Sequence, residues 1–194
     1  MNPHLKTLLD ELAAFGAAHD GDPANGATRM LNITPDTGEF LAVLAKAAGA
    51  RRILEIGTSN GYSTLWLAAA VADVGGAVTT VELAHGKIEM ARANFARAGL
   101  DTRITLLEGD AGTMLASLFD ASFELLFLDA QRSAYLDWWP DIRRVLRPGG
   151  LLVVDNATSH AQDLAAFTAA VRADRAFSTS LVPVGKGEFL AVKA

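Results

Sequence analysis

Cysteine is absent from the 194 residues of this chain. Its absence excludes disulfide bonds, thiolate metal sites and cysteine catalysis, and it fits a reducing cytoplasm. Long hydrophobic runs are also missing, since the longest mostly apolar stretch, residues 65–71, is far too short to span a bilayer. The first residues lack the basic start and the apolar core of a secretion signal. We therefore expect a cytoplasmic protein that has no membrane partner.

Positive charge is scarce as well. The chain carries 17 Lys and Arg against 22 Asp and Glu, a formal net charge of −5, and it has no basic block. A nucleic-acid partner is not expected, because phosphate binding needs clustered cations. Apolar residues make up 51% of the chain, and a chain of this length can bury a substantial core. These features predict one domain over residues 1–194 with a small-molecule partner.

The order of the apolar patterns predicts an α/β fold. Residues 2–18 show the spacing of an amphipathic helix, residues 20–26 read as a loop, and a second helix is expected at 36–48. Strand-like runs then alternate with helical stretches, and they lie at 52–56, 77–81, 103–107, 123–128 and 150–154. Such alternation is typical of a doubly wound, Rossmann-like, mostly parallel sheet with helices on both faces.

The C-terminal end departs from this alternation. Residues 178–184 and 188–193 are two extended runs joined by the sequence Gly-Lys-Gly. This arrangement predicts an antiparallel hairpin that closes the otherwise parallel sheet.

The most informative segment follows the first of the five strands. Gly57 and Gly61 enclose the sequence Thr-Ser-Asn, and a helical pattern begins directly behind them. Glycines let the backbone turn sharply and approach a ligand, and the free N–H groups of the next helix point at that ligand. A phosphate-binding P-loop would need a lysine after Gly61, and a dinucleotide fingerprint would need a glycine at Ser59. Taken alone, the loop also fits a tight turn that binds nothing.

Acidic residues at the ends of four successive strands favour a ligand site. They are Glu55, Glu82, Asp110 and Asp129. The carboxyl ends of parallel strands meet at one edge of a doubly wound sheet, where ligands bind. A carboxylate at that edge can accept both hydroxyls of a ribose. The acidic rim therefore predicts a cofactor that carries a ribose and an amino group but no pyrophosphate.

Four motifs of the chain belong together. They are Glu55-x-Gly57-x-x-x-Gly61-Tyr62-Ser63-Thr64, Glu82 followed by Ala91-Arg92-x-Asn94, Phe127-x-Asp129-Ala130, and Arg147-Pro148-Gly149-Gly150 leading into Val154-Asp155-Asn156. On these motifs the chain resembles the class I S-adenosylmethionine-dependent methyltransferases, and more narrowly the catechol and caffeoyl-CoA O-methyltransferases. The resemblance implies a seven-stranded sheet of order 3-2-1-4-5-7-6, a homodimer, and methyl transfer to a hydroxyl of a small aromatic acceptor.

The same resemblance implies which residues hold S-adenosylmethionine. The glycine loop would surround its methionine part, Glu82 would hold the ribose hydroxyls, and Asp110 with Ala111 would border the adenine. A segment at Asn32 would fold over the cofactor. The implied set is Asn32, Ile33, Glu55, Gly57, Thr58, Ser59, Gly61, Tyr62, Ser63, Glu82, Leu83, Asp110, Ala111 and Asp129.

A divalent cation is implied as well. Asp129, Asp155 and Asn156 match the metal ligands of the family, and all three follow adjacent strands. Their oxygen donors suit Mg²⁺, Mn²⁺ or Ca²⁺, which would stabilise the oxyanion of a phenolic acceptor. Without a metal, residues 155–156 would simply form a turn or a helix cap after a strand.

One position departs from the family pattern. Gln131 and Arg132 stand where the family usually has aspartate and lysine, and arginine stays protonated, so it cannot act as the base. Arg132 could still orient an anionic substrate or stabilise a phenolate, and His160 is an alternative base. Two further hypotheses therefore stay open: a metal-independent methyltransferase in which Arg132 orients an acidic substrate, and a non-catalytic S-adenosylmethionine-binding protein.

Three aromatic residues follow Arg132 in the predicted helix. Tyr135 is expected to pack in the core, as is one of Trp138 and Trp139, because adjacent helical residues point about 100° apart. The other tryptophan is expected to line the site or a subunit contact. By the same resemblance, residues 1–30 are expected to cover the substrate or to contact a second subunit.

Overall fold

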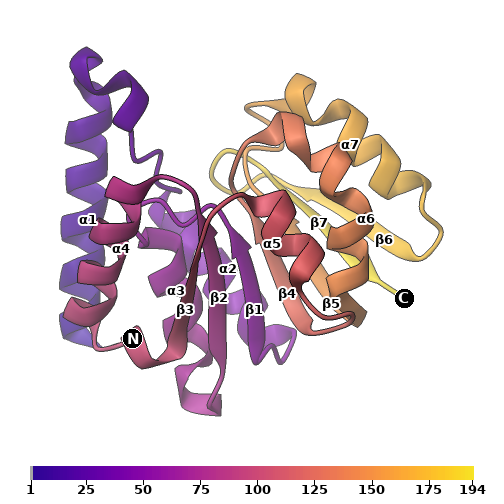
Figure 1. The fold of residues 1–194 in the computed structure, drawn as a ribbon, viewed down its shortest axis with the longest axis horizontal. Helices are drawn as coiled ribbons and strands as arrows, with labels where there is room; N and C mark the ends of the chain where they lie inside the picture. The colour runs from indigo at the N-terminus through magenta and orange to yellow at the C-terminus, as the bar shows by residue number, and fades with distance from the viewer. Residues whose placement is uncertain (1) are drawn as a thin grey trace.

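A seven-stranded sheet forms the centre of the protein (Figure 1). The computed structural model describes residues 2–194, so Met1, the first residue of the predicted domain, lies outside the described residues. The strands lie in the order β3-β2-β1-β4-β5-β7-β6. Their bounds are β1 Arg52–Ile56, β2 Ala77–Glu82, β3 Ile104–Glu108, β4 Phe123–Leu128, β5 Leu146–Val154, β6 Phe177–Val182 and β7 Glu188–Lys193. The pairs β5–β7 and β6–β7 are antiparallel, and the predicted order and hairpin are confirmed.

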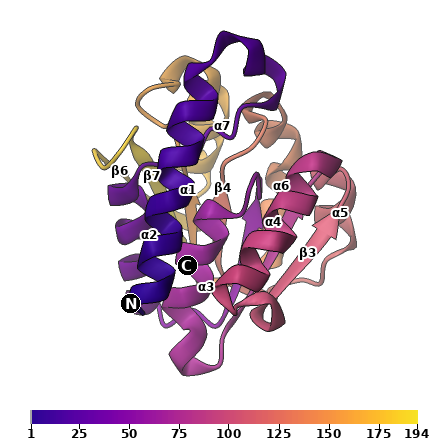
Figure 2. The same ribbon diagram turned by 90° about the vertical axis from the view of Figure 1, so that its left-hand side faces the viewer.

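Helices cover both faces of this sheet. One apolar core cluster joins the sheet to α1 (Pro3–Gly21), α2 (Pro35–Ala47), α3 (Tyr62–Val71) and α4 (His85–Ala98). A second cluster lies under α5 (Ala111–Ser117), α6 (Tyr135–Val145) and α7 (Ala161–Ala173). Figure 2 shows α1 in front of α2 and α3 on its face of the sheet. Short 3-10 turns complete the fold, namely η1 Pro23–Thr28, η2 Ala72–Val74, η3 Asp101–Arg103 and η4 Arg132–Ala134.

The central strands are apolar because both of their faces are covered. Every residue of β4 is buried, and in β1 Ile53 joins the first core cluster whereas Leu54 joins the second. A strand that is buried on both faces needs apolar side chains in both directions. The continuous apolar runs in the sequence are explained by this position.

Two segments differ from the prediction. β5 begins at Leu146 rather than at residue 150, because Leu146 pairs with Phe123 ahead of a register shift in the β4–β5 ladder. Residues 20–26, expected to form a loop, contain the end of α1 and most of η1. Asp22 begins η1 by accepting a hydrogen bond from the N–H of Ala24, so a turn-forming acid acts here as a helix cap.

The sheet brings the predicted strand-end residues to one edge. The ladder continues past the strands: Gly57 donates its N–H to Val81, Asp129 donates to Ile56, and Asp155 donates to Leu128, at 3.0, 3.0 and 3.1 Å. These bonds fix the backbone of the residues that follow β1, β4 and β5. None of the helices in residues 2–194 combines the length and the apolar character that a membrane crossing requires.

Candidate functional site

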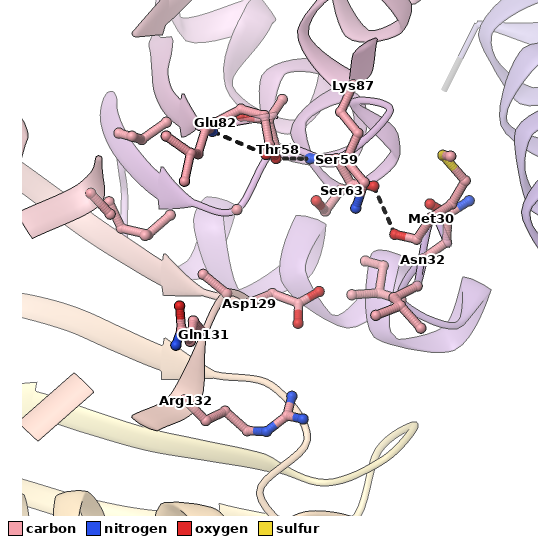
Figure 3. Close-up of a pocket in the computed structure, with 18 of the residues that line it drawn as sticks. Met30, Asn32, Thr58, Ser59, Ser63, Glu82, Lys87, Asp129, Gln131 and Arg132 are labelled. Carbon is pink, nitrogen blue, oxygen red and sulfur yellow. Dashed lines mark hydrogen bonds between the residues drawn. The ribbon is translucent and has the colours of Figure 1, made fainter. Parts of the chain in front are cut away.

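A cavity of about 600 Å³ opens at the carboxyl edge of the sheet (Figure 3). Most of the predicted site residues line it, and they are Asn32, Ile33, Gly57, Thr58, Ser59, Tyr62, Ser63, Glu82, Leu83, Asp110, Ala111, Asp129, Arg132 and Asn156. Glu55, Gly61 and Asp155 were also predicted as site residues, but they are not part of its lining. The three exceptions have different structural roles.

The turn after β1 depends on its first glycine. Gly57 has a φ of +104°, and a Cβ there would lie 2.1 Å from the backbone oxygen of Asp129. A side chain is therefore excluded by contact as well as by conformation. Ser59, with a φ of +49°, completes the turn at the cavity wall.

Gly61 has a packing role. It begins α3 in a left-handed conformation, and a Cβ there would lie 2.5 Å from the ring of Phe95. The glycine is needed for the close packing of α4 on the turn. Its contact with the cofactor stays a prediction.

Glu82 is held in place by three backbone N–H groups. Its Oε2 accepts from Ser59 at 2.8 Å, and its Oε1 accepts from Leu83 and Ala84 at 3.0 and 2.9 Å. These bonds join the end of β2 to the turn after β1, as the dashed lines in Figure 3 show for Ser59. Oε1 already accepts two N–H groups, whereas Oε2 accepts one and keeps acceptor capacity for a hydroxyl group of a ligand.

Glu55 is fully buried beneath the turn instead of lining the cavity. Its carboxyl accepts hydrogen bonds from Ser63 and Thr80, both at 2.6 Å, and from Thr64. Burial raises the pKa of Glu55 to about 7, although the three hydroxyl donors act in the opposite direction. Glu55 thereby ties the first turn of α3 to β1 and β2, and its predicted part in cofactor binding stays a prediction.

Asp110 borders the cavity as the cap of α5. It accepts hydrogen bonds from the N–H and the Oγ1 of Thr113, at 2.8 and 2.9 Å. The backbone N–H of Thr113 lowers the pKa of Asp110 below its usual value. Its neighbour Ala111 also lines the cavity.

A strap of residues 29–33, which follows η1, lines the cavity. Asp20 accepts the N–H groups of Met30 and Leu31 at 2.6 and 2.7 Å, and Ser59 donates its hydroxyl to the Met30 carbonyl at 2.7 Å. Asn32 donates its side-chain amide to Leu12 of α1 at 3.1 Å. The sequence pointed to Asn32 and Ile33 but not to Arg29, Met30 or Leu31, because Asp20 is joined to this segment by contacts ten and eleven residues further along the chain.

Asp129, Asp155 and Asn156 come together at the ends of β4 and β5. Asn156 directs its Nδ2 at Asp155 Oδ2, at 2.7 Å, and at Asp129 Oδ1, at 3.2 Å. Asp129 and Asn156 line the cavity, whereas Asp155 lies behind them and is only 3% exposed. The predicted part of all three residues in metal binding stays a prediction.

This group gathers carboxyl groups whose ionisation is disfavoured. Burial, followed by the charges of Asp155 and Glu55, raises the pKa of Asp129 to about 8. Glu188 at the start of β7 is fully buried, and its pKa is raised to about 10 by burial and then by Asp155. Within residues 2–194 no group of three or more His, Cys, Asp and Glu side chains is arranged to hold a metal ion.

Arg132 faces the cavity from η4, near Asp129 in Figure 3. Its Nε is buried and has no hydrogen-bond partner among residues 2–194. The closest ionic contact of this nitrogen is Asp163 Oδ2 at 3.5 Å, on an exposed carboxylate. The guanidinium therefore keeps donor capacity for a ligand.

The aromatic residues take the places that were expected. Tyr135 is buried, and its hydroxyl accepts the N–H of Ala130 at 2.6 Å, which fixes the backbone next to Asp129. Trp139 packs against Phe167 and Phe177 in the core, and Trp138 lines the cavity.

Several cavity residues were not singled out by the sequence. His160 was weighed only as an alternative base, yet it lines the cavity and shares a hydrogen bond of 2.9 Å with Ser159. Lys87 of α4 and Lys186 of the β6–β7 loop also line it. No local pattern marks either lysine, because each reaches the cavity through the packing of its element.

The chain belongs to the O-methyltransferase family, whose sequence profile matches residues 4–194. A catechol O-methyltransferase of Mycobacterium tuberculosis is 39% identical over 77% of this chain and 67% of its own length. The O-methyltransferase of Bacillus cereus, crystallised in complex with SAH, is 26% identical with a TM-score of 0.81 and covers 97% of this chain and 91% of its own. TomG of Streptomyces achromogenes, an O-methyltransferase involved in tomaymycin synthesis and solved with SAM, is 26% identical with a TM-score of 0.80 and covers 100% and 91%. The recognition of the family from the motifs is confirmed.

Proposed function

We propose that this protein transfers a methyl group from S-adenosylmethionine to a hydroxyl of a small aromatic molecule. The observation that carries the proposal is Glu82, a carboxylate held by three backbone N–H groups beside the Gly57 turn. It would accept the ribose hydroxyls, with Asp110 and Ala111 beside the base. The SAH and SAM complexes of the two similar O-methyltransferases support the same cofactor here.

The reaction is an in-line displacement. The hydroxyl oxygen of the acceptor loses its proton and forms a bond to the methyl carbon, and the carbon–sulfur electron pair stays on sulfur. Positioning of the two reactants contributes much of the rate. Asp129, which lines the cavity after β4, lies between the turn after β1 and Arg132 and would orient the acceptor.

A divalent cation fits the donor set at Asp129, Asp155 and Asn156. The three side chains converge, and they offer oxygen donors of the kind that such cations prefer. Asn156 would present its oxygen after its amide group turns by half a rotation. A cation bound there would stabilise the oxyanion of the acceptor.

The proton of the acceptor needs a route that avoids Arg132, because a guanidinium stays protonated. His160 lines the same cavity, and an imidazole nitrogen can act as a general base. We propose His160 as the group that receives this proton and passes it to solvent.

One observation favours a second candidate function. The unpartnered Nε of Arg132 would suit a metal-independent methyltransferase that orients an acidic substrate. The hypothesis of a non-catalytic S-adenosylmethionine-binding protein has no such observation in its favour, and a measured turnover would exclude it.

Two measurements test the proposed function. Titration with S-adenosylmethionine should raise the melting temperature, since a ligand at about 100 times its Kd stabilises the native state by about 2.7 kcal/mol. Turnover on a panel of catechols should then be lost with EDTA and restored by Mg²⁺ or Mn²⁺. Binding without turnover on any acceptor would favour the non-catalytic protein, and turnover that EDTA leaves unchanged would favour the metal-independent enzyme.

Some expectations from the sequence stay predictions. They are the single domain over residues 1–194, the homodimer and the cytoplasmic location. We propose residues 1–30 as a cover for the substrate, because Asp20 at the end of α1 fixes the strap over the cavity.

A further inference from the structure

Two basic side chains, Arg132 and Lys186, line the cavity from different elements. Arg132 lies in η4, which follows β4 along the chain, and Lys186 lies in the loop between β6 and β7. Asp129 is the one acidic residue of β4, β5 and the loops after them that lines the cavity.

Neither side chain donates a hydrogen bond to another residue in the range 2–194. Lys186 makes no side-chain hydrogen bond or ion pair with any residue in the range 2–194. Arg132 has the buried, unpartnered Nε described above and one contact of 3.5 Å with an exposed carboxylate. A buried polar nitrogen without a partner is costly, so it indicates a ligand that supplies an acceptor.

The backbone of Lys186 is fixed by contacts on both sides. Its carbonyl accepts the N–H groups of Thr158 and Ser159 at 3.1 and 3.0 Å. Gly185 before it donates its N–H to Asp36 Oδ2 at 3.1 Å, and Gly187 after it has no room for a side chain beside Thr158. Both glycines have positive φ values, +55° and +91°. The loop therefore presents the lysine at a defined place, beside Thr158 and Ser159, which follow Asn156 by two and three residues.

We propose that Arg132 and Lys186 together bind an acidic group of the acceptor, so that the preferred substrate is a hydroxylated aromatic carboxylate. The inference rests on the proposed function and names its substrate class. A carboxylate between a guanidinium and an ammonium forms charge-assisted hydrogen bonds, which are stronger than neutral ones. Binding this group at the cavity rim would direct the ring hydroxyls toward Asp129 and the methyl donor.

Steady-state kinetics of the full chain test the proposal with two matched acceptors. Protocatechuate carries a ring carboxylate, and its amide, protocatechuamide, has the same shape without the charge. Both Arg132→Met and Lys186→Met should raise the KM for protocatechuate by about tenfold and change the KM for the amide by less than about twofold. Lys46→Met is the matched control. Lys46 is exposed near the end of α2, so this substitution removes the same charge at a place away from the cavity.

The affinity for SAH, measured by calorimetry on the same variants, separates the acceptor from the cofactor. Unchanged SAH affinity together with the selective rise in KM supports the proposal. Weaker SAH binding with no selective change in KM would overturn it, because the two cations would then hold the carboxylate of the cofactor. Equal KM values for acid and amide in the unmodified protein would overturn it too and leave the proposed function intact. SAH binding without methylation of any acceptor would exclude the proposed function, and this inference would fail with it.

Discussion

Gly57 leaves no space between itself and Asp129: a Cβ at Gly57 would lie 2.1 Å from the Asp129 backbone oxygen. The contact joins the turn after β1 to the end of β4, and both residues line the cavity. A backbone oxygen cannot move aside as the end of a flexible side chain can. The close approach therefore sets the relative position of the proposed cofactor and acceptor sites.

Gly57→Ala should consequently lower both stability and cofactor affinity. The positive φ of +104° alone costs about 1–3 kcal/mol for a residue with a Cβ, and the clash with Asp129 adds to it. Unfolding in urea and calorimetry with S-adenosylmethionine are the measurements. Gly75→Ala separates the two effects, because Gly75 has a φ of +71° but open space around it. An equal loss of unfolding free energy in Gly57→Ala and Gly75→Ala would show that the Asp129 contact contributes nothing to stability.

Glu82→Gln should weaken S-adenosylmethionine binding by about ten- to a hundredfold. The amide keeps one acceptor oxygen but turns an NH₂ group toward backbone N–H donors that Glu82 now satisfies. Calorimetry gives the Kd, and Glu108→Gln is the matched control, because Glu108 ends the next strand and pairs with Arg92 on the surface. The same affinity in the unmodified protein and Glu82→Gln would contradict the ribose assignment.

Local patterns in the sequence predicted much of the fold and of the site. Apolar runs marked the buried strands, and the acids at their ends marked the edge where Glu82, Asp110 and Asp129 meet the cavity. The order of the strands came from the resemblance and is confirmed.

Other features depend on contacts between distant residues and could not be predicted. Lys186 reaches the cavity because its loop bonds to Thr158 and Ser159, and Asp20 reaches the strap ten residues further on. Glu55 could have been placed correctly, since strand residues alternate between faces and Ile53, two residues earlier, lies in the core cluster that includes α3. The prediction treated Glu55 as a strand-end acid and overlooked this alternation.

Asp155→Asn should separate the metal proposal from the cofactor proposal. Loss of one carboxylate from the proposed cation site should lower turnover by about a hundredfold and abolish its dependence on added Mn²⁺. S-adenosylmethionine affinity should stay the same, because Asp155 lies behind the cavity wall. Asp137→Asn, on the exposed side of α6, is the control for the change of charge. Full turnover in Asp155→Asn would rule out the cation site.

The buried carboxyl of Glu55 should make stability depend on pH. Burial raises its pKa from 4.5 to about 7, so between these values the folded protein keeps a proton that the unfolded chain has released. The contribution of the Glu55 carboxyl to the free energy of unfolding is therefore fully present below about pH 4.5. It falls as the pH rises toward 7, by about 3 kcal/mol in all. Glu55→Gln cannot titrate at this position, so its stability relative to the unmodified protein should increase between about pH 5 and about pH 8. Urea unfolding at the two pH values measures this difference, in which contributions common to both proteins cancel. A difference that stays constant with pH would mean that the hydroxyls of Ser63, Thr64 and Thr80 compensate fully for the burial of the charge.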